Sequence, residues 1–293
     1  MRERQGMDAE VSRSFDRMWA DLESIGRVSS GGYQRFAWTR EDHTLREWFA
    51  GQAAERGLDL TQDRVGNQWA WWGDPDDAVR SGRPGIATGS HLDSVPDGGA
   101  YDGPLGVVSA FAALDALRSA GIEPHRPIGI VNFVDEEGAR FGVACGGSRV
   151  LTGAMTAQRA LGLTDDSGIT LAQALALAGQ DVRHFGADPQ TLARVGTFIE
   201  LHVEQGRGLV DLDAPVGLAR DIWPHGRWRI DLPGEANHAG STRMQDRRDA
   251  MVALAEVVLA ARDAALRHRS VATIGKVAVE PGGVNAIASH TTA

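Results

Sequence analysis

The chain has 293 residues, 42% of them hydrophobic, and a formal net charge of −9 at pH 7. This length suggests two domains, and the composition excludes a disordered chain. The negative charge disfavours nucleic acid and anionic membranes as partners, because both attract basic proteins. No run of about 18 apolar residues occurs, so the sequence predicts no membrane-spanning segment and no membrane partner.

The single cysteine, Cys145, cannot form an intramolecular disulfide and excludes a cysteine-rich zinc site. The first six residues are polar and lack the apolar core of a secretory signal. Free thiols are typical of reducing compartments, so we expect the protein in the cytoplasm.

The first part of the chain predicts two helices and two strands. Apolar residues recur at helical spacing over residues 11–25, and a second apolar stripe follows a helix start at Thr39 and ends near Gly57. Residues 58–61 and 68–72 read as strands around a turn at Gly66. The stretch 74–84 is polar, and we interpret it as a loop.

The stretch 89–103 places one histidine and several acids between a strand and a helix. His91 and Asp93 follow the apolar strand 85–88, and Asp102 precedes a helix that opens at Pro104. In open α/β sheets, ligands bind at the carboxyl ends of the strands. Imidazole and carboxylate groups suit a divalent metal such as zinc, although a lone His-x-Asp is more often a surface turn.

Two further apolar strands end in ionisable residues. Strand 128–133 runs into Asp135, Glu136 and Glu137, three acids that a surface turn would tolerate. In a metal site, one such carboxylate can bind an ion while its neighbour moves protons. We interpret residues 197–206 as a third buried strand, which would place Glu200, His202 and Glu204 on one face. A histidine in a strand is more often a hydrogen-bonded core residue than a metal ligand. Here, however, it is the third apolar strand to end in ionisable residues, which favours the metal site.

The pattern changes near residue 216. A strand at 228–232, a helix from about residue 247 and a strand at 271–279 are followed by a glycine-rich stretch at 282–287. This order suggests a small α+β domain beside the first. We therefore predict a metal-binding α/β domain at residues 1–215 and a second domain at residues 216–293.

Five motifs together carry a family resemblance. They are Gly89-Ser90-His91-Leu92-Asp93, Tyr101-Asp102-Gly103-Pro104-Leu105-Gly106, Glu136-Glu137-Gly138-Ala139-Arg140-Phe141, His202-Val203-Glu204-Gln205-Gly206 and Ala236-Asn237-His238-Ala239-Gly240. Their types and order resemble the amidohydrolase branch of the peptidase M20 family. That branch holds N-carbamoyl-L-amino acid hydrolases, allantoate amidohydrolases and β-ureidopropionases, and the whole chain is most similar to allantoate amidohydrolases.

The resemblance implies a mixed-sheet metallohydrolase catalytic domain with a smaller α+β lid and dimerisation domain. It also implies two divalent ions per subunit, zinc or manganese with cobalt as a further option. His91 and His202 would each bind one ion, Asp102 would bridge both, and Glu137 would bind the second ion. Asp93 would orient His91.

The resemblance assigns the remaining site residues to proton transfer and substrate. Glu136 would be the general base. Gln205, His238 and Asn285 would contact a small ureido substrate. His238 would act in the active site of the partner subunit of a homodimer, because the lid domain also dimerises.

The sequence departs from the family's pattern after the position of Asn285. The family takes a last metal-ligating histidine and a substrate-gripping arginine from positions after the one that Asn285 matches, and this sequence ends at Ala293. We therefore expect both domains to be partial, with the returning C-terminal part of the family fold missing.

The implied reaction is hydrolysis of allantoate to ureidoglycine, ammonia and carbon dioxide. The alternatives are an N-carbamoyl-L-amino acid hydrolase, an aminopeptidase or dipeptidase of the same family, and an inactive fragment.

Overall fold

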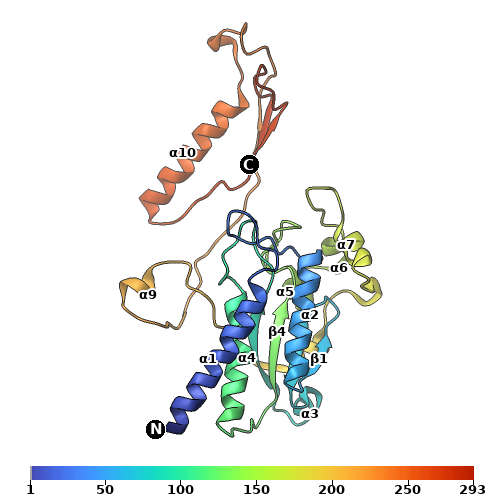
Figure 1. The fold of residues 1–293 in the computed structure, drawn as a ribbon. Coiled ribbons are helices and arrows are strands. Elements are labelled where there is room, and N and C mark those ends of the chain that lie inside the picture. The colour runs from blue at the N-terminus through green and yellow to red at the C-terminus, as the bar shows by residue number, and fades with distance from the viewer. Residues whose placement is uncertain (1) are drawn as a thin grey trace. The chain divides into compact units, whose positions relative to one another are not determined.

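The computed structural model describes the backbone of residues 2–293 and the side chains of residues 9–293. The chain divides into two compact units, Met1–Pro215 and Val216–Ala293, and each unit has its own sheet (Figure 1). Among the described residues, none of the helices combines the length and the apolar character that crossing a bilayer requires.

The first unit contains a five-stranded mixed sheet with the strand order β1-β2-β4-β3-β5. Its strands are β1 (Asp59–Gln62), β2 (Gln68–Trp72), β3 (Gly85–His91), β4 (Ile128–Phe133) and β5 (Val195–Ile199). β3 pairs in parallel with both β4 and β5, whereas β2 runs antiparallel to β1 and to β4. The predicted mixed α/β fold is therefore confirmed, and three parallel strands end at the same sheet edge.

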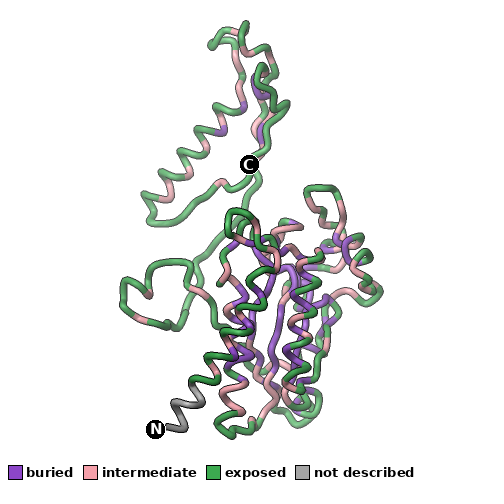
Figure 2. Tube along the Cα trace, in the orientation of Figure 1, coloured by how far each residue is buried: buried purple, intermediate pink, exposed green. Residues whose placement is uncertain are grey.

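Helices cover both faces of this sheet. One apolar cluster joins one face to α1 (Arg2–Leu22), α2 (Arg40–Glu55) and α4 (Pro104–Ser119). A second cluster joins the opposite face to α5 (Gly146–Leu151), α6 (Ala157–Leu161) and α7 (Leu171–Leu177). Ala70 of β2 belongs to the first cluster, while its neighbours Trp69 and Trp71 belong to the second. This alternation is the two-residue period of a strand, and it makes the central strands the most buried part of the unit (Figure 2).

Several helices differ from the sequence prediction. The stretch 74–84 contains the short helix α3 (Pro75–Arg80), so the predicted loop is wrong. The Asp74 carboxylate accepts hydrogen bonds from the amides of Asp76 and Asp77, and Pro75 occupies the first turn, where its missing N–H costs nothing. α1 begins at Arg2 rather than near residue 11. The short helices η1 (Val182–His184), α8 (Pro189–Ala193) and α9 (Gly208–Asp211) complete the unit.

The predicted buried strand at 197–206 is wrong in both extent and burial. β5 ends at Ile199, and residues 200–205 have no regular structure. Phe198 is 42% exposed and Ile199 is 60% exposed, because in the described chain β5 lies at the edge of its sheet. Glu200, His202 and Glu204 therefore do not share one face of a strand.

The second unit is built from three short strands and one long helix. β6 (Asp231–Pro233), β8 (His290–Thr292) and β7 (Ala278–Glu280) form an antiparallel sheet in that order. α10 (Ala250–His268) follows the short helix η2 (Met244–Asp246) and buries Ala250 and Leu254. The predicted helix is present, but both predicted strands are displaced toward the C-terminus. The third strand, β8, was not predicted.

Replacement of Gly89 by alanine should destabilise the first unit strongly. Gly89 has a φ of +136°, and a Cβ there would lie 2.1 Å from the carbonyl oxygen of Val131 on β4. The strand pair must separate to admit the methyl group, so we expect the free energy of unfolding to fall by about 3–5 kcal/mol. Urea denaturation followed by circular dichroism measures this difference.

Gly51 provides the matched control for that measurement. It lies within α2, and a Cβ there would meet no atom within 4 Å. Gly51→Ala should raise the stability by about 0.5–1 kcal/mol, because alanine loses less backbone entropy in a helix. Equal unfolding midpoints for Gly89→Ala and the parent would contradict the close approach of β3 and β4.

Candidate metal centre

The carboxyl edge of the three parallel strands collects the ionisable residues that the sequence singled out. His91 is the last residue of β3, and Glu136 and Glu137 follow the end of β4. His202 follows β5, in the irregular segment. β3 lies between β4 and β5 in the sheet. His91 therefore has the acids that follow β4 on one side and His202, which follows β5, on the other.

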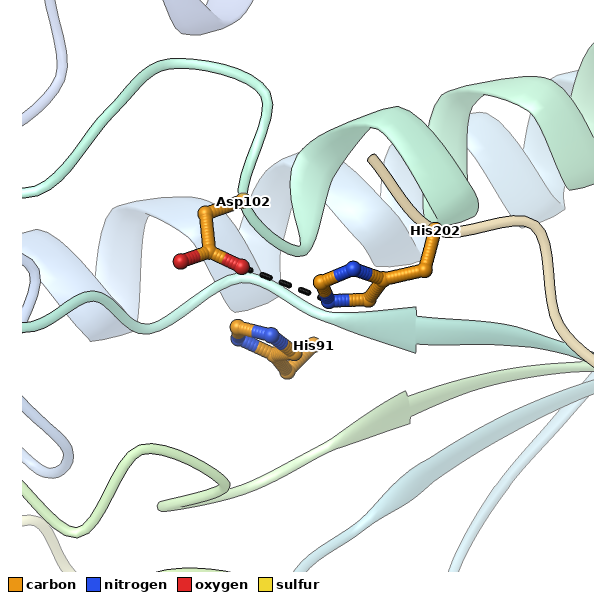
Figure 3. A group of neighbouring side chains, drawn as sticks. All are labelled: His91, Asp102 and His202. Carbon is orange, nitrogen blue, oxygen red and sulfur yellow. Dashed lines mark ion pairs between the residues drawn. The ribbon is translucent and has the colours of Figure 1, made fainter. Parts of the chain in front are cut away.

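His91, Asp102 and His202 form the first group, whose ligand atoms all lie within 4.8 Å of one another (Figure 3). The Oδ1 atom of Asp102 lies 3.3 Å from Nε2 of His202. The two imidazole rings have centroids 6.2 Å apart. Asp102 directly precedes Gly103, the residue before α4. The φ of Gly103 is +87°, a conformation that favours glycine, and this turn sets the position of Asp102.

His91, Glu136 and Glu137 form the second group, again with ligand atoms within 4.8 Å of one another. Nε2 of His91 lies 3.7 Å from Oε2 of Glu136. The carboxyl group of Glu137 shares a hydrogen bond with Asp102. The two groups therefore meet at His91 and again at the contact between Asp102 and Glu137.

Backbone carbonyl groups orient both imidazole rings. Nδ1 of His91 lies 3.0 Å from the carbonyl oxygen of Asp93, and Nδ1 of His202 lies 2.9 Å from that of Val203. A carbonyl oxygen only accepts, so each Nδ1 carries a proton and donates it. Nε2 of each ring is then left to face the carboxylates, which is the usual arrangement of a metal-ligating histidine.

The Asp93 carboxylate connects the ends of β3 and β4. Its Oδ1 atom accepts a hydrogen bond from the amide of Glu136 at 3.1 Å, and Oδ2 accepts one from the amide of Glu137 at 3.0 Å. Oδ1 also lies 3.5 Å from Nδ1 of His91. This buried side chain thus contacts the histidine and fixes the backbone of both acids.

The site carries an excess of negative charge. Burial opposes protonation of His91, but the carboxylates of Asp93, Glu136 and Glu137 outweigh it and raise the pKa of the ring to about 9. Burial and the charge of Asp102 raise the pKa of Glu137 to about 7. Burial and the nearby acids likewise raise the pKa of Asp135 well above its usual range. The excess of negative charge at the site therefore favours the binding of a cation.

The donor set fits a divalent cation. Imidazole nitrogens directed by carbonyl groups, together with adjacent carboxylate oxygens, are ligands of zinc, manganese and cobalt. A bound cation would also neutralise the acids that raise the pKa values of their neighbours.

The remaining predicted residues lie in two places. Gln205, in the segment after β5, has a φ of 43° and donates a hydrogen bond from Nε2 to Oδ2 of Asp102 at 2.6 Å. His238 and Asn285 lie in the second unit, where the amide of Ala239 donates to the carbonyl of Asn285 at 2.9 Å. Nδ1 of His238 accepts a hydrogen bond from the amide of Gly240, so this imidazole is neutral and its Nε2 carries the proton.

Two contacts at the site were not predicted from the sequence. The ring of Tyr101, next to Asp102, stacks on Trp19 of α1 with centroids 4.9 Å apart. The thiol of Cys145 donates a hydrogen bond to Glu136 at 3.3 Å. The first contact joins α1 to the loop before α4, and the second lies within the connection between β4 and α5. Neither has a sequence spacing that indicates it.

Asp93→Asn should weaken metal binding by about 10–100-fold, the usual cost of losing a group that positions a ligand. An asparagine retains one acceptor oxygen, and its amide nitrogen cannot accept from the second of the two backbone amides. Isothermal titration with manganese measures the effect. Asp97→Asn in the loop before Asp102 serves as the control, and unchanged affinity in Asp93→Asn would contradict the positioning role.

Comparison with known proteins identifies the family. Residues 87–287 match the model of peptidase family M20/M25/M40. An N-carbamoyl-L-amino acid amidohydrolase of Geobacillus stearothermophilus is 37% identical over 281 residues, which cover 93% of this chain and 66% of that protein. A ureidoglycolate hydrolase of Arabidopsis thaliana is 33% identical over 92% of this chain and 58% of its own length.

A solved structure shows the same fold. The amidase of the hydantoinase/carbamoylase family from Burkholderia vietnamiensis matches with a TM-score of 0.81 and 29% identity, over 96% of this chain and 67% of that one. The chain thus spans 58–66% of the length of these two curated relatives. On the strength of the matched family model, the chain belongs to the peptidase M20 family.

Proposed function

We propose that the chain carries the metal-binding part of an amidohydrolase that cleaves a ureido C–N bond. The observation that supports this most directly is the convergence of His91, Asp102 and His202 with Glu136 and Glu137 at one sheet edge. The M20 family is metal-dependent, and these residues fit divalent ions. Bound ions would polarise the ureido carbonyl and lower the pKa of a water molecule.

We assign His91, Asp102 and His202 to one ion, because their ligand atoms form a single group. Glu137, which shares a hydrogen bond with Asp102, would serve the second ion with Asp102 as the shared ligand. Zinc, manganese and cobalt all accept these ligands.

Glu136 is the general base of the proposed reaction. Its side chain is 34% exposed, whereas His91 beside it is 2% exposed, so the carboxylate is open to water and substrate. Glu136 would take a proton from the attacking water and then deliver it to the departing nitrogen. The carbamate released with that nitrogen would decompose to ammonia and carbon dioxide.

Gln205, His238 and Asn285 are proposed to contact the substrate. The protonated Nε2 of His238 can donate a hydrogen bond to the oxygen on which negative charge develops. We propose that residues 216–293 act as the lid and dimerisation domain for the catalytic unit 1–215. His238 would then serve the active site of the partner subunit in a homodimer.

Two substrate classes are in competition. The motif resemblance favours allantoate, which would yield ureidoglycine, ammonia and carbon dioxide. The 37% identical relative favours N-carbamoyl-L-amino acids. Both substrates present the same ureido carbonyl, so the proposed chemistry is common to them.

Ammonia release tests the proposal and separates the substrates. Allantoate, ureidoglycolate, several N-carbamoyl-L-amino acids and a set of dipeptides are offered with manganese or with zinc. The assay uses this chain and the longest natural reading frame that contains it. Ammonia from a ureido compound would support the proposal, and the preferred compound identifies the substrate. Cleavage of dipeptides alone, or metal binding without any turnover in either protein, would overturn it.

A further inference from the structure

The two carboxylate oxygens of Glu136 face different groups. Oε1 lies 3.3 Å from Sγ of Cys145, whose thiol donates a hydrogen bond to it. Oε2 lies 3.7 Å from Nε2 of His91, on the side of the metal ligands. One oxygen is therefore held by an uncharged donor, while the other remains directed toward the site.

The backbone fixes Cys145 against Glu136. The amide of Cys145 donates to the carbonyl of Glu136, and the next amide, of Gly146, donates to Asp135 at 2.8 Å. The amide of Gly147 continues this pattern by donating to Val134 at 3.0 Å. The first turn of α5 is thus bonded to the segment that carries the acids.

The conformation of Cys145 indicates that its side chain is needed. Its φ of 57° lies in the left-handed region, which costs a non-glycine residue about 1–2 kcal/mol. Glycine would avoid this cost, and glycines occupy the two positions that follow. A cysteine at this point retains a donor that reaches Glu136.

We propose that Cys145 is a positioning residue for Glu136. Its thiol holds Oε1, so that Oε2 keeps the orientation needed to exchange a proton with water and substrate. A thiol is a weak donor and brings no charge of its own, so it orients the carboxylate without an ion pair. The inference rests on the proposed role of Glu136 as general base.

Kinetics test the functional part of this proposal. Cys145→Ala removes the donor and should lower kcat about tenfold with little change in KM, while Cys145→Ser keeps a donor and should restore most of the rate. Both variants should bind the same number of metal ions as the parent, measured by elemental analysis. Parental kcat in Cys145→Ala, or equal losses in both variants, would overturn the proposal.

Infrared spectroscopy tests the contact without requiring turnover. The chain has one cysteine, so its S–H stretching band is a single, assignable signal. Glu136→Ala removes the acceptor and should move this band to higher wavenumber, whereas Glu137→Ala should leave it in place. An unmoved band in Glu136→Ala would refute the role of Cys145. A band that moves in a protein that hydrolyses no ureido compound would instead count against the proposed function alone.

Discussion

Glu136→Gln is expected to reduce turnover by about 10²–10⁴-fold, the range that a general acid–base group contributes. Glutamine has nearly the same shape as glutamate but cannot take up a proton at neutral pH. The bond from the Glu136 amide to Asp93 is made by the backbone, so the substitution leaves it intact. Metal binding should therefore survive, and steady-state ammonia release combined with elemental analysis measures both properties.

Two variants make this result specific to Glu136. Glu137→Gln changes the neighbouring acid and should lower metal occupancy, because Glu137 is a proposed ligand. Glu47→Gln removes an exposed carboxylate that pairs with His43 on the surface of α2 and should change neither property. A Glu136→Gln protein that hydrolyses its substrate at the parental rate would remove Glu136 from the mechanism.

The sheet edge could be predicted because buried parallel strands leave a clear pattern. The runs before His91 and before Asp135 are apolar and short, and ionisable residues follow each run at once. Parallel strands end together, so two such runs indicate that their polar residues meet. The family motifs added the roles, and the matched family model confirms that resemblance.

β5 could not be predicted correctly because an apolar run does not show what covers it. Phe198 and Ile199 have the same residue types as a buried strand, yet both are exposed at the sheet edge. The helix α3 was missed for a different reason. The polar stretch after Trp72 has no apolar stripe, and its signal is only the Asp74 cap followed by Pro75.

The contacts that position the site depend on tertiary structure. The sequence places Asp93 near His91, two residues away. Its bonds to the amides of Glu136 and Glu137 span 43 and 44 residues and require β3 and β4 to be neighbours. The contact of Cys145 with Glu136 requires a left-handed residue, which the local sequence does not indicate.

His91→Ala should abolish binding of the ion assigned to His91, Asp102 and His202, because the Nε2 atom of His91 is a proposed ligand of that ion. His202→Ala should abolish binding of the same ion, since His202 belongs to the same group of ligand atoms. The two substitutions remove the same imidazole from different positions. Equal losses in the two variants would therefore indicate that both histidines bind one ion.

Titration of the metal-free proteins with manganese and with zinc, followed by elemental analysis after dialysis, measures these stoichiometries. The parent should bind more ions than either variant, and His91→Ala and His202→Ala should bind the same number. His43→Ala removes a histidine whose side chain is 70% exposed on α2, and it should match the parent. If His91→Ala retained the parental number of ions, His91 would not be a ligand, and the assignment of His91, Asp102 and His202 to one ion would be wrong.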